Sequence, residues 1–195
     1  MQFVLASASP RRRELMSLIS ENFTVTLPET DESVISGDTP PYMYVQELAL
    51  LKAAAAAKFH LKQKDAIIIA ADTIVVADGK ILGKPHDESD AKYTLLMLSG
   101  KTHSVYTGYC ILRMSDAYTV CNRVKTDVTF RDLSEEKIDA YIRTGEPMDK
   151  AGAYGIQGKG SFLVSKIDGD YFNVVGFPVS DIAKTLEDEF DIQIF

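Results

Sequence analysis

The chain has 195 residues, enough to bury one substantial hydrophobic core in a single domain, with or without two lobes. Apolar residues make up 46% and charged residues 25% of the sequence, which excludes a disordered chain. The net charge of −7 argues against a broad nucleic-acid interface, because such an interface requires a basic face. No apolar run approaches the roughly 20 residues of a membrane span, and no signal peptide is recognisable, so neither a membrane partner nor a leader is expected.

The cysteines and histidines give no sign of a metal centre or a disulfide framework. Cys110 and Cys121 both lie in strand-like runs and lack metal-ligand spacing. His60, His86 and His103 are scattered and form no zinc motif. These features favour a reduced, cytoplasmic protein.

In the first half of the chain, the sequence pattern predicts alternating strands and helices. The expected elements are a buried strand over residues 2–6, a helix over 9–20, a short strand over 23–27, a helix over 41–60, an apolar strand over 66–71, a hairpin over 74–81 turning at Asp78-Gly79, and a helix over 87–99.

The second half contains two long runs with period-two patterning, residues 102–114 and 117–130, which predict an antiparallel pair. A helix over 134–144, a hairpin over 161–176 with Gly169 in its turn, and a helix over 178–189 are expected to follow. Strands and helices that alternate around an antiparallel insertion indicate an α/β fold, with a mixed, twisted sheet flanked by helices.

The first unusual segment follows the first expected strand. Ser9 and Pro10 are typical of a helix N-cap and first position, yet the next residues are Arg11, Arg12 and Arg13 rather than acids. Free amides, the helix dipole and guanidinium groups together predict an anion site, with phosphate as the obvious ligand. A solvated basic turn at a surface corner is the alternative.

Two charged residues lie among apolar neighbours. Asp72 interrupts AIIIAADTIVVA and is expected at the end of a buried strand, where open α/β sheets bind ligands, with Thr73 as a second polar group. The alternative is an acid that closes the strand by bonding a turn. Lys52 falls on the apolar stripe of the 41–60 helix, so its ammonium must either snorkel to solvent or meet an anion.

Three further candidates lie in loops. Lys84 precedes Pro85, which restricts its backbone, although a surface turn lysine is the default interpretation. Glu32 lies in an acidic loop, as a metal ligand or a solvated side chain. Gln157 lies within a run of four glycines (Gly152, Gly155, Gly158 and Gly160), where its amide could read a base edge or could simply be solvated. Together, the cations and carboxylates suit phosphoryl chemistry.

These segments match a known family. LASASPRRREL resembles the signature L-A-S-x-S-P-R-R-x-E-L of Maf-like nucleotide pyrophosphatases, and AADTIV, the Lys84-Pro85 pair, THSVYTG and DKAGAYGIQG resemble successive blocks of that family. The resemblance implies one Maf-like domain over residues 1–195, with a fold related to inosine triphosphate pyrophosphatases and a cleft between two lobes. It also implies a hydrolase that converts nucleoside triphosphates to the monophosphate and pyrophosphate with a divalent metal, Mg²⁺ or Mn²⁺.

The resemblance also assigns roles to the candidates. Asp72 would be the proton acceptor for the attacking water, and Asp72 and Glu32 would bind the metal. The triphosphate ligands would be Ser7, Arg11, Arg12, Lys52 and Lys84, with Lys52, Lys84 and Glu32 counted among the catalytic groups. The specificity positions would be Arg11, Thr73 and Gln157.

The form AYGIQG resembles the branch that prefers dTTP and UTP, with modified pyrimidine nucleotides as further candidates. Two alternatives stay open: a 7-methyl-GTP pyrophosphatase, whose branch carries a glutamate-containing variant of this motif, and a nucleotide-binding regulator of cell division. The expected partner is a small-molecule nucleotide, and a homodimer is an open option.

Overall fold

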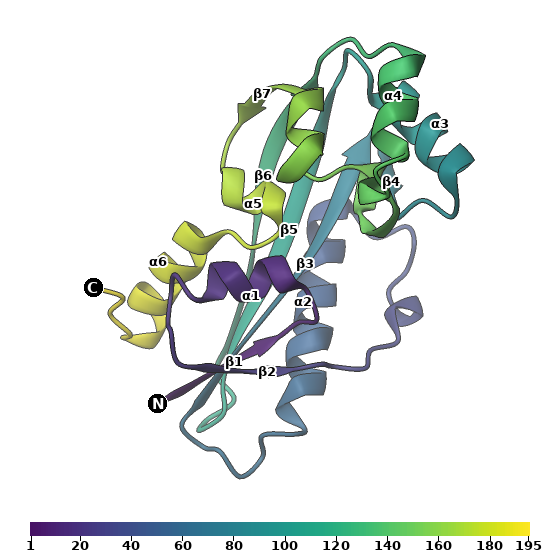
Figure 1. Ribbon diagram of the computed structural model, residues 1–195. Coiled ribbons are helices and arrows are strands. Elements are labelled where there is room, and N and C mark those ends of the chain that lie inside the picture. Colours follow the sequence, from purple (N-terminus) through teal and green to yellow (C-terminus); the bar gives the residue numbers. More distant parts are fainter. The chain divides into compact units, whose positions relative to one another are not determined.

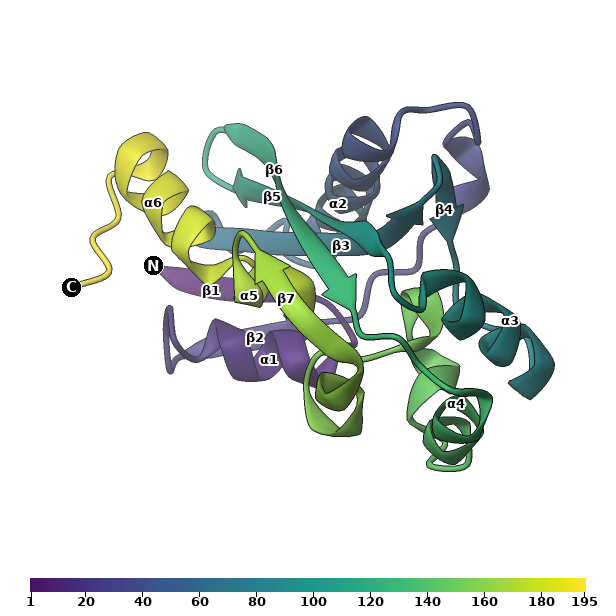
Figure 2. The same ribbon diagram turned by 90° about the horizontal axis from the view of Figure 1, so that it is seen from above.

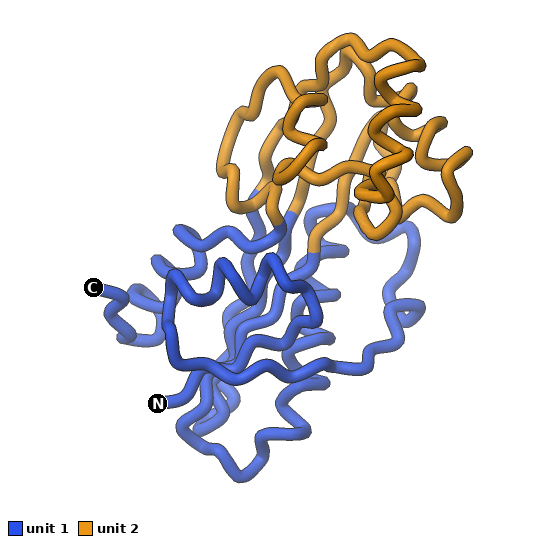
Figure 3. The backbone as a smooth tube through the Cα atoms, in the orientation of Figure 1, with its two compact units in different colours: residues 1–72, 107–124, 176–195 blue, residues 73–106, 125–175 orange.

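The computed structural model describes residues 1–195 and divides into two compact units (Figure 3). The first unit comprises residues 1–72, 107–124 and 176–195, and the second comprises residues 73–106 and 125–175. The strands are β1 (Gln2–Ala6), β2 (Phe23–Thr26), β3 (Ala66–Ala77), β4 (Lys80–Leu82), β5 (Thr102–Arg113), β6 (Thr119–Phe130) and β7 (Val164–Asp168). The α-helices are α1 (Pro10–Met16), α2 (Pro41–Ala57), α3 (Glu88–Leu98), α4 (Glu135–Ile142), α5 (Tyr171–Val175) and α6 (Val179–Phe190).

These strands form one mixed sheet in the order β2-β1-β3-β5-β6-β7, with β4 paired to β3 (Figure 1). The pairs β1–β2 and β1–β3 are parallel, whereas β3–β4 and β6–β7 are antiparallel. The mixed sheet with flanking helices confirms the predicted α/β class. None of the helices combines the length and the hydrophobicity that crossing a bilayer requires.

In the first unit, β1 lies between β2 and β3 and is covered on both faces. Figure 2 shows α2 on one side of these strands and α1 on the other. Alternate residues of the strands pack against the small side chains of α2, forming a cluster of Val4, Ala6, Ala49, Ala53, Ala56, Ala66, Ile68 and Ala70. Since strands buried on both faces require apolar side chains at nearly every position, the continuous apolar runs of β1 and β3 follow from this layering.

The α2 helix also lies close to β5, at Gly108. A Cβ atom at this position would lie 2.2 Å from the carbonyl oxygen of Val45 and 2.7 Å from the amide nitrogen of Gln46. Both neighbouring atoms belong to the backbone of α2, so no side-chain rotation could relieve the overlap. Gly108 therefore sets the distance between α2 and the sheet.

The two cysteines lie opposite each other on β5 and β6. Their Sγ atoms are 2.8 Å apart, and both thiols are free. The Cys121 carbonyl accepts a hydrogen bond from Gln46 Nε2 on α2 at 3.2 Å. The cysteines thus pack where the two strands meet α2.

The second unit has its own core. Leu95 and Leu98 of α3 and Ile138 and Ile142 of α4 pack with Phe130 of β6 in one buried cluster. Asp87 caps α3 by accepting from the amide of Asp90, and Ser134 caps α4 by accepting from the amide of Lys137. These caps fix the beginnings of both helices, which agree with the predicted beginnings to within one residue.

Three predicted elements were wrong in extent or type. The first helix ends at Met16 rather than near residue 20, because Leu18 and Ile19 bond to Leu15 and Met16 as tighter turns. The strand expected over 66–71 continues without a break to Ala77. The predicted hairpin over 74–81 is confirmed, because β3 pairs antiparallel with β4 across the Asp78-Gly79 turn.

The second strand of the hairpin expected around Gly169 is instead the helix α5. The Asp170 side chain accepts from the amide of Phe172 at 2.8 Å, which favours a helical turn. The buried Asn173 amide donates to the Val105 carbonyl at 3.1 Å and to Thr126 Oγ1 at 2.9 Å. These tertiary bonds override the strand propensity of the aromatic and β-branched residues in YFNVV.

A buried histidine lies in the core of the second unit. His103 Nε2 is 2.7 Å from the Tyr154 hydroxyl, and its ring contacts those of Phe130 and Tyr154 edge-on. His103 Nδ1 is buried without a hydrogen-bond partner. Burial lowers the pKa of His103 from its ordinary value of 6.5 to about 4, although the charge of Asp127 opposes this shift. His103 is therefore neutral in the folded protein at physiological pH.

This shift predicts a loss of stability in acid. As the pH falls through 6.5, the unfolded chain binds a proton at His103 before the folded chain does, so the free energy of unfolding decreases until about pH 4. The full difference corresponds to about 3 kcal/mol. Urea unfolding at pH 7 and pH 4.5 should show this loss in the wild type and a smaller loss in His103→Phe. Substitution of the exposed His86 by Asn should give the same loss of stability as the wild type. An equal loss in the wild type, His103→Phe and His86→Asn would contradict the assignment of this loss to His103.

Candidate active site

The N-terminus of α1 has the local structure that its sequence predicts. Ser9 caps the helix by accepting from the Arg12 amide at 3.5 Å, Pro10 occupies the first position, and the first turn contains no acid. Ser7 is buried just before the cap, where its Oγ accepts from the Ser9 amide at 3.2 Å. The helix therefore presents cations where its dipole and free amides already favour an anion.

The arginines differ in their surroundings. Arg12 Nε donates to the Gly176 carbonyl at 2.8 Å, which fixes the guanidinium inside the first unit. Burial lowers the pKa of Arg12, while the nearby Asp72 carboxylate raises it and the nearby Arg11 cation lowers it further. Arg13 is exposed. Arg11, Arg12 and Asp72 thus interact with one another, whereas Arg13 faces solvent.

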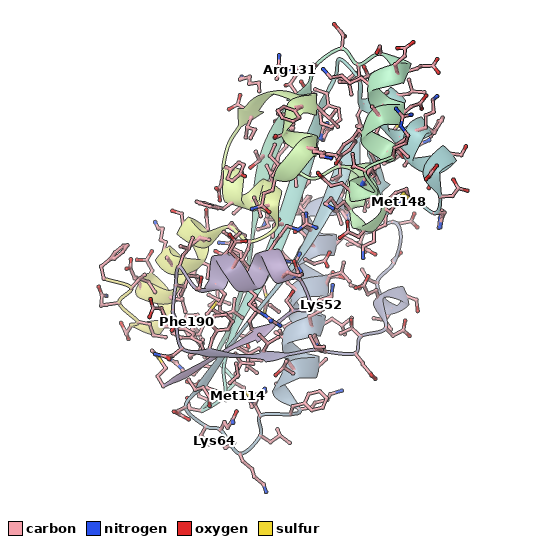
Figure 4. The ribbon with its side chains drawn as sticks, viewed as in Figure 1. Lys52, Lys64, Met114, Arg131, Met148 and Phe190 are labelled. Atoms are coloured by element: carbon pink, nitrogen blue, oxygen red, sulfur yellow. The ribbon has the colours of Figure 1, made fainter.

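Lys52 lies between two carboxylates. Its Nζ is 2.5 Å from Asp72 Oδ1 and 3.0 Å from Glu32 Oε1 (Lys52 is labelled in Figure 4). The side chains of Lys52 and Asp72 are only 17% and 15% exposed, whereas that of Glu32 is 50% exposed. Of the two predicted outcomes for a lysine on the apolar stripe, the structure shows the second: the ammonium meets anions instead of snorkelling to solvent.

The position of Asp72 corrects the sequence prediction. It lies inside β3, five residues before the strand ends at Ala77, rather than at the end of a strand. Ala66, Ile68 and Ala70 face α2, and the two-residue period of a strand places Asp72 next in the same row. Lys52 belongs to the buried stripe of α2 with Leu48 and Ala49, so the two charges meet between helix and sheet. The same period directs Thr73 to the opposite face.

Glu32 reaches this pair from the acidic loop. It begins a short 3₁₀ helix, Glu32–Val34, which is capped by Asp31 through a 3.0 Å bond from the Ser33 amide. The turn directs the Glu32 carboxylate toward α2, where it pairs with Lys52. The structure therefore brings Glu32 together with Lys52 and Asp72.

Tyr44 was missed by the sequence analysis. Desolvation by burial raises the pKa of Tyr44, the charges of Glu32 and Asp72 raise this pKa further, and the Lys52 cation partly offsets the shift. Its phenol is thus close to the same two carboxylates. Tyr44 precedes Lys52 by eight residues, so it lies on the same face of α2. Helical spacing from Lys52 was the signal that could have identified it.

The remaining predicted residues belong to the second unit. Lys84 is exposed beside the buried Pro85, and Thr73 is half-buried in β3. Gln157 is also half-buried and directly precedes the 3₁₀ helix Gly158–Leu163. That these three residues act with the residues of the first unit stays a prediction.

The carboxylates of Asp72 and Glu32 could bind a divalent ion that takes only one or two ligands from the protein. No group of three or more His, Cys, Asp or Glu side chains could hold a metal by itself. However, Mg²⁺ commonly binds one or two carboxylates together with substrate phosphates. Asp72 and Glu32 are both bound to one ammonium group, which places their oxygens close enough to share a cation.

Comparison with known proteins identifies the family. The family model described as Maf-like protein matches residues 2–189. The chain belongs to the Maf-like protein family. Two relatives are both named dTTP/UTP pyrophosphatase. The relative from Bacillus cytotoxicus is 48% identical, in an alignment that covers 97% of this chain and 96% of the relative. The relative from Bacillus cereus strain AH187 is 47% identical, in an alignment that covers 99% of this chain and 97% of the relative.

The fold of this Maf-like chain also resembles a solved structure. A HAM1 protein from Coxiella burnetii covers 96% of this chain, and the chain covers 99% of it, with a TM-score of 0.51 and 13% sequence identity. At this identity the likeness concerns the fold alone. It agrees with the predicted relation to the fold of inosine triphosphate pyrophosphatases.

Proposed function

We propose that this Maf-like protein is a nucleoside triphosphate pyrophosphatase that hydrolyses dTTP and UTP, and modified pyrimidine nucleotides of the same shape, to the monophosphate and pyrophosphate. The observation that carries the proposal is the Lys52 ammonium bound by Asp72 and Glu32, with Arg12 beside Asp72. The two relatives named dTTP/UTP pyrophosphatase match nearly the whole chain, which supports the same substrates here.

In this reaction, water attacks the α-phosphorus of the nucleotide. Asp72 accepts one proton from that water as the new oxygen–phosphorus bond forms. The bond between the α-phosphorus and the bridging oxygen breaks, and pyrophosphate leaves with the electron pair. Asp72 then returns the proton to solvent, so no group of the protein is consumed.

The cations stabilise the charge on the phosphates. Arg11 and Arg12 bind phosphate oxygens at the N-terminus of α1, where Ser7 and the free amides add further donors. Lys52 and Lys84 neutralise the charge that develops on the leaving group. Because Lys52 bonds to Asp72, it also orients the proton acceptor.

A divalent cation, Mg²⁺ or Mn²⁺, is part of the proposal, with Asp72 and Glu32 as its protein ligands. When bound, it would polarise the phosphate oxygens and lower the barrier to attack. On nucleotide binding, Lys52 would exchange Glu32 for a phosphate oxygen and keep its bond to Asp72, a change that a flexible lysine side chain with three donors can make.

Base selection is assigned to Gln157, together with Arg11 and Thr73. A glutamine amide carries both a donor and an acceptor, which matches the alternating donor and acceptor edge of uracil and thymine. The cytoplasm is the proposed location, in agreement with two free cysteines. A homodimer remains compatible with this function.

A nucleotide panel tests the proposal. Purified protein is incubated with Mg²⁺ or Mn²⁺ and with dTTP, UTP, dCTP, ATP, GTP and 7-methyl-GTP, and the products are separated by ion-exchange chromatography. We expect pyrophosphate and monophosphate in equal amounts, fastest from dTTP and UTP. Release of orthophosphate, or no turnover, would contradict the reaction, whereas faster cleavage of 7-methyl-GTP would contradict only the choice of base. Removal of the metal ion by a chelator is expected to abolish turnover.

A further inference from the structure

The carboxylate of Glu146 binds the backbone of the glycine-rich loop 150–160. Its Oε2 accepts from the amide of Lys159 at 3.0 Å, and its Oε1 accepts from the amide of Gly160 at 3.0 Å. Glu146 begins the 3₁₀ helix Glu146–Asp149, in the segment of Figure 4 where Met148 is labelled. Hydrogen bonds between a carboxylate and backbone amides are charge-assisted and stronger than neutral ones.

Tyr141 extends this anchor to the other side of the loop. Its hydroxyl donates to Glu146 Oε1 at 3.0 Å and accepts from the amide of Gly155 at 3.2 Å. Tyr141 is buried on α4, so its ring is fixed by the core of the second unit. The anchored amides, at Gly155, Lys159 and Gly160, lie on both sides of Gln157.

The glycines of the loop are explained by the same contacts. A Cβ at Gly158 would lie 2.9 Å from Glu146 Oε2, and the residue has a left-handed φ of +68°. A Cβ at Gly160 would lie 2.1 Å from the Gly155 carbonyl oxygen and 2.7 Å from the Tyr141 hydroxyl. Side chains are therefore excluded because the loop folds tightly onto Glu146 and Tyr141.

We propose that Glu146 is a positioning residue that fixes the backbone on both sides of Gln157 and thereby determines the selection of the pyrimidine base. Tyr141 assists it, because its hydroxyl links Glu146 to the Gly155 amide. Glu146 lies outside the residues that the sequence analysis assigned to the site, and its carboxylate acts through the loop rather than on the reacting atoms. The link to base selection rests on the proposed function, whereas the anchoring of the loop does not.

Amide hydrogen exchange tests the anchor without reference to activity. In Glu146→Gln, an NH₂ group replaces one of the two carboxylate oxygens and faces a backbone N–H, so one hydrogen bond is lost and the other loses its charge assistance. We therefore expect amide hydrogen exchange at Lys159 and Gly160 to become about tenfold faster or more. Tyr141→Phe removes only the hydroxyl that accepts from the Gly155 amide, so hydrogen exchange should become faster mainly at Gly155. Glu88→Gln, at the exposed start of α3, is the matched control and should change none of these amides. Unchanged exchange in Glu146→Gln, or in Tyr141→Phe if the former does not fold, would overturn the proposal.

Kinetics test the link to Gln157. We expect Glu146→Gln to reduce kcat/KM for dTTP and UTP about tenfold, mainly through a higher KM, because the base contact is misplaced while the reacting groups are unchanged. In a Gln157→Ala background, the same substitution should cost less than about twofold, since the group that it positions is absent. An equal loss in both backgrounds would refute positioning through Gln157. A wild-type protein without nucleotide turnover would instead refute the proposed function, and the exchange measurement would still decide the anchor.

Discussion

Replacement of Asp72 by Asn is expected to reduce kcat for dTTP and UTP by about 10²- to 10⁴-fold, the usual contribution of a positioned general base. Asn has nearly the same size as Asp and keeps an oxygen for Lys52, so the fold and the pairing of Lys52 with Glu32 should persist. Nucleotide binding should change much less than turnover. Steady-state kinetics, together with calorimetric titration of a non-hydrolysable UTP analogue, separate the two effects.

Asp127→Asn is the matched control for this experiment. Asp127 also lies on a strand and pairs with a lysine, Lys125, at 2.9 Å, but it is not among the proposed site residues. It should retain kcat within about twofold of the wild type, as surface ion pairs contribute little. If Asp72→Asn keeps full turnover, Asp72 is not the proton acceptor. Tight nucleotide binding with negligible turnover in both the wild type and the variant would favour a nucleotide-binding regulator instead.

Replacement of Gly108 by Ala should cause a large loss of stability. The added methyl would overlap the backbone of α2 at Val45 and Gln46, so helix and sheet must separate. We expect the free energy of unfolding to decrease by about 3 kcal/mol, the upper end of the usual cost of overpacking. Because α2 carries Lys52, the displacement should also reduce kcat/KM. Urea unfolding and steady-state kinetics measure the two effects.

Gly37→Ala provides the control, since no atom lies within 4 Å of a Cβ built at that position. It should leave stability unchanged or raise it slightly, because alanine restricts the unfolded chain. An Ala variant of Gly108 as stable as that of Gly37 would show that α2 can move away from the sheet without cost.

Sequence patterns predicted the elements whose local signals agree with their tertiary surroundings. Ser9, through its side-chain oxygen, and Pro10, through its fixed backbone angle, define the start of α1 locally, and the Asp78-Gly79 turn adopts the left-handed conformations expected of it. Residues 171–175 were assigned wrongly because five residues, four of them aromatic or β-branched, show no clear period. The buried hydrogen bonds of Asn173, which favour the helix, are made with β5 and β6 and cannot be inferred from the local sequence.

In the candidate site too, local sequence signals predicted single residues but not their tertiary partners. The helical stripe identified Lys52 as a buried cation, but only the pairing of α2 with β3 shows that Asp72 is its partner. Asp72 was expected to end a strand because a carboxylate interrupts an apolar run. The strand continues because Lys52 compensates that charge. Glu32 approaches the pair through the geometry of its loop, which spacing along the chain does not determine. Tyr44, in contrast, lies on the same helix as Lys52, so helical spacing could have identified it.

The bond from Arg12 Nε to the Gly176 carbonyl has a consequence for ligand affinity. An arginine side chain that is mobile in the free protein loses up to about 2 kcal/mol of rotamer entropy when it binds a phosphate. Arg12 loses that freedom during folding, so its guanidinium is preorganised and phosphate binding carries no such penalty. Lys84 is exposed, so in the proposed complex its side chain would lose its freedom only when the ligand binds. At equal charge, the arginine should therefore contribute more to ground-state affinity than the lysine.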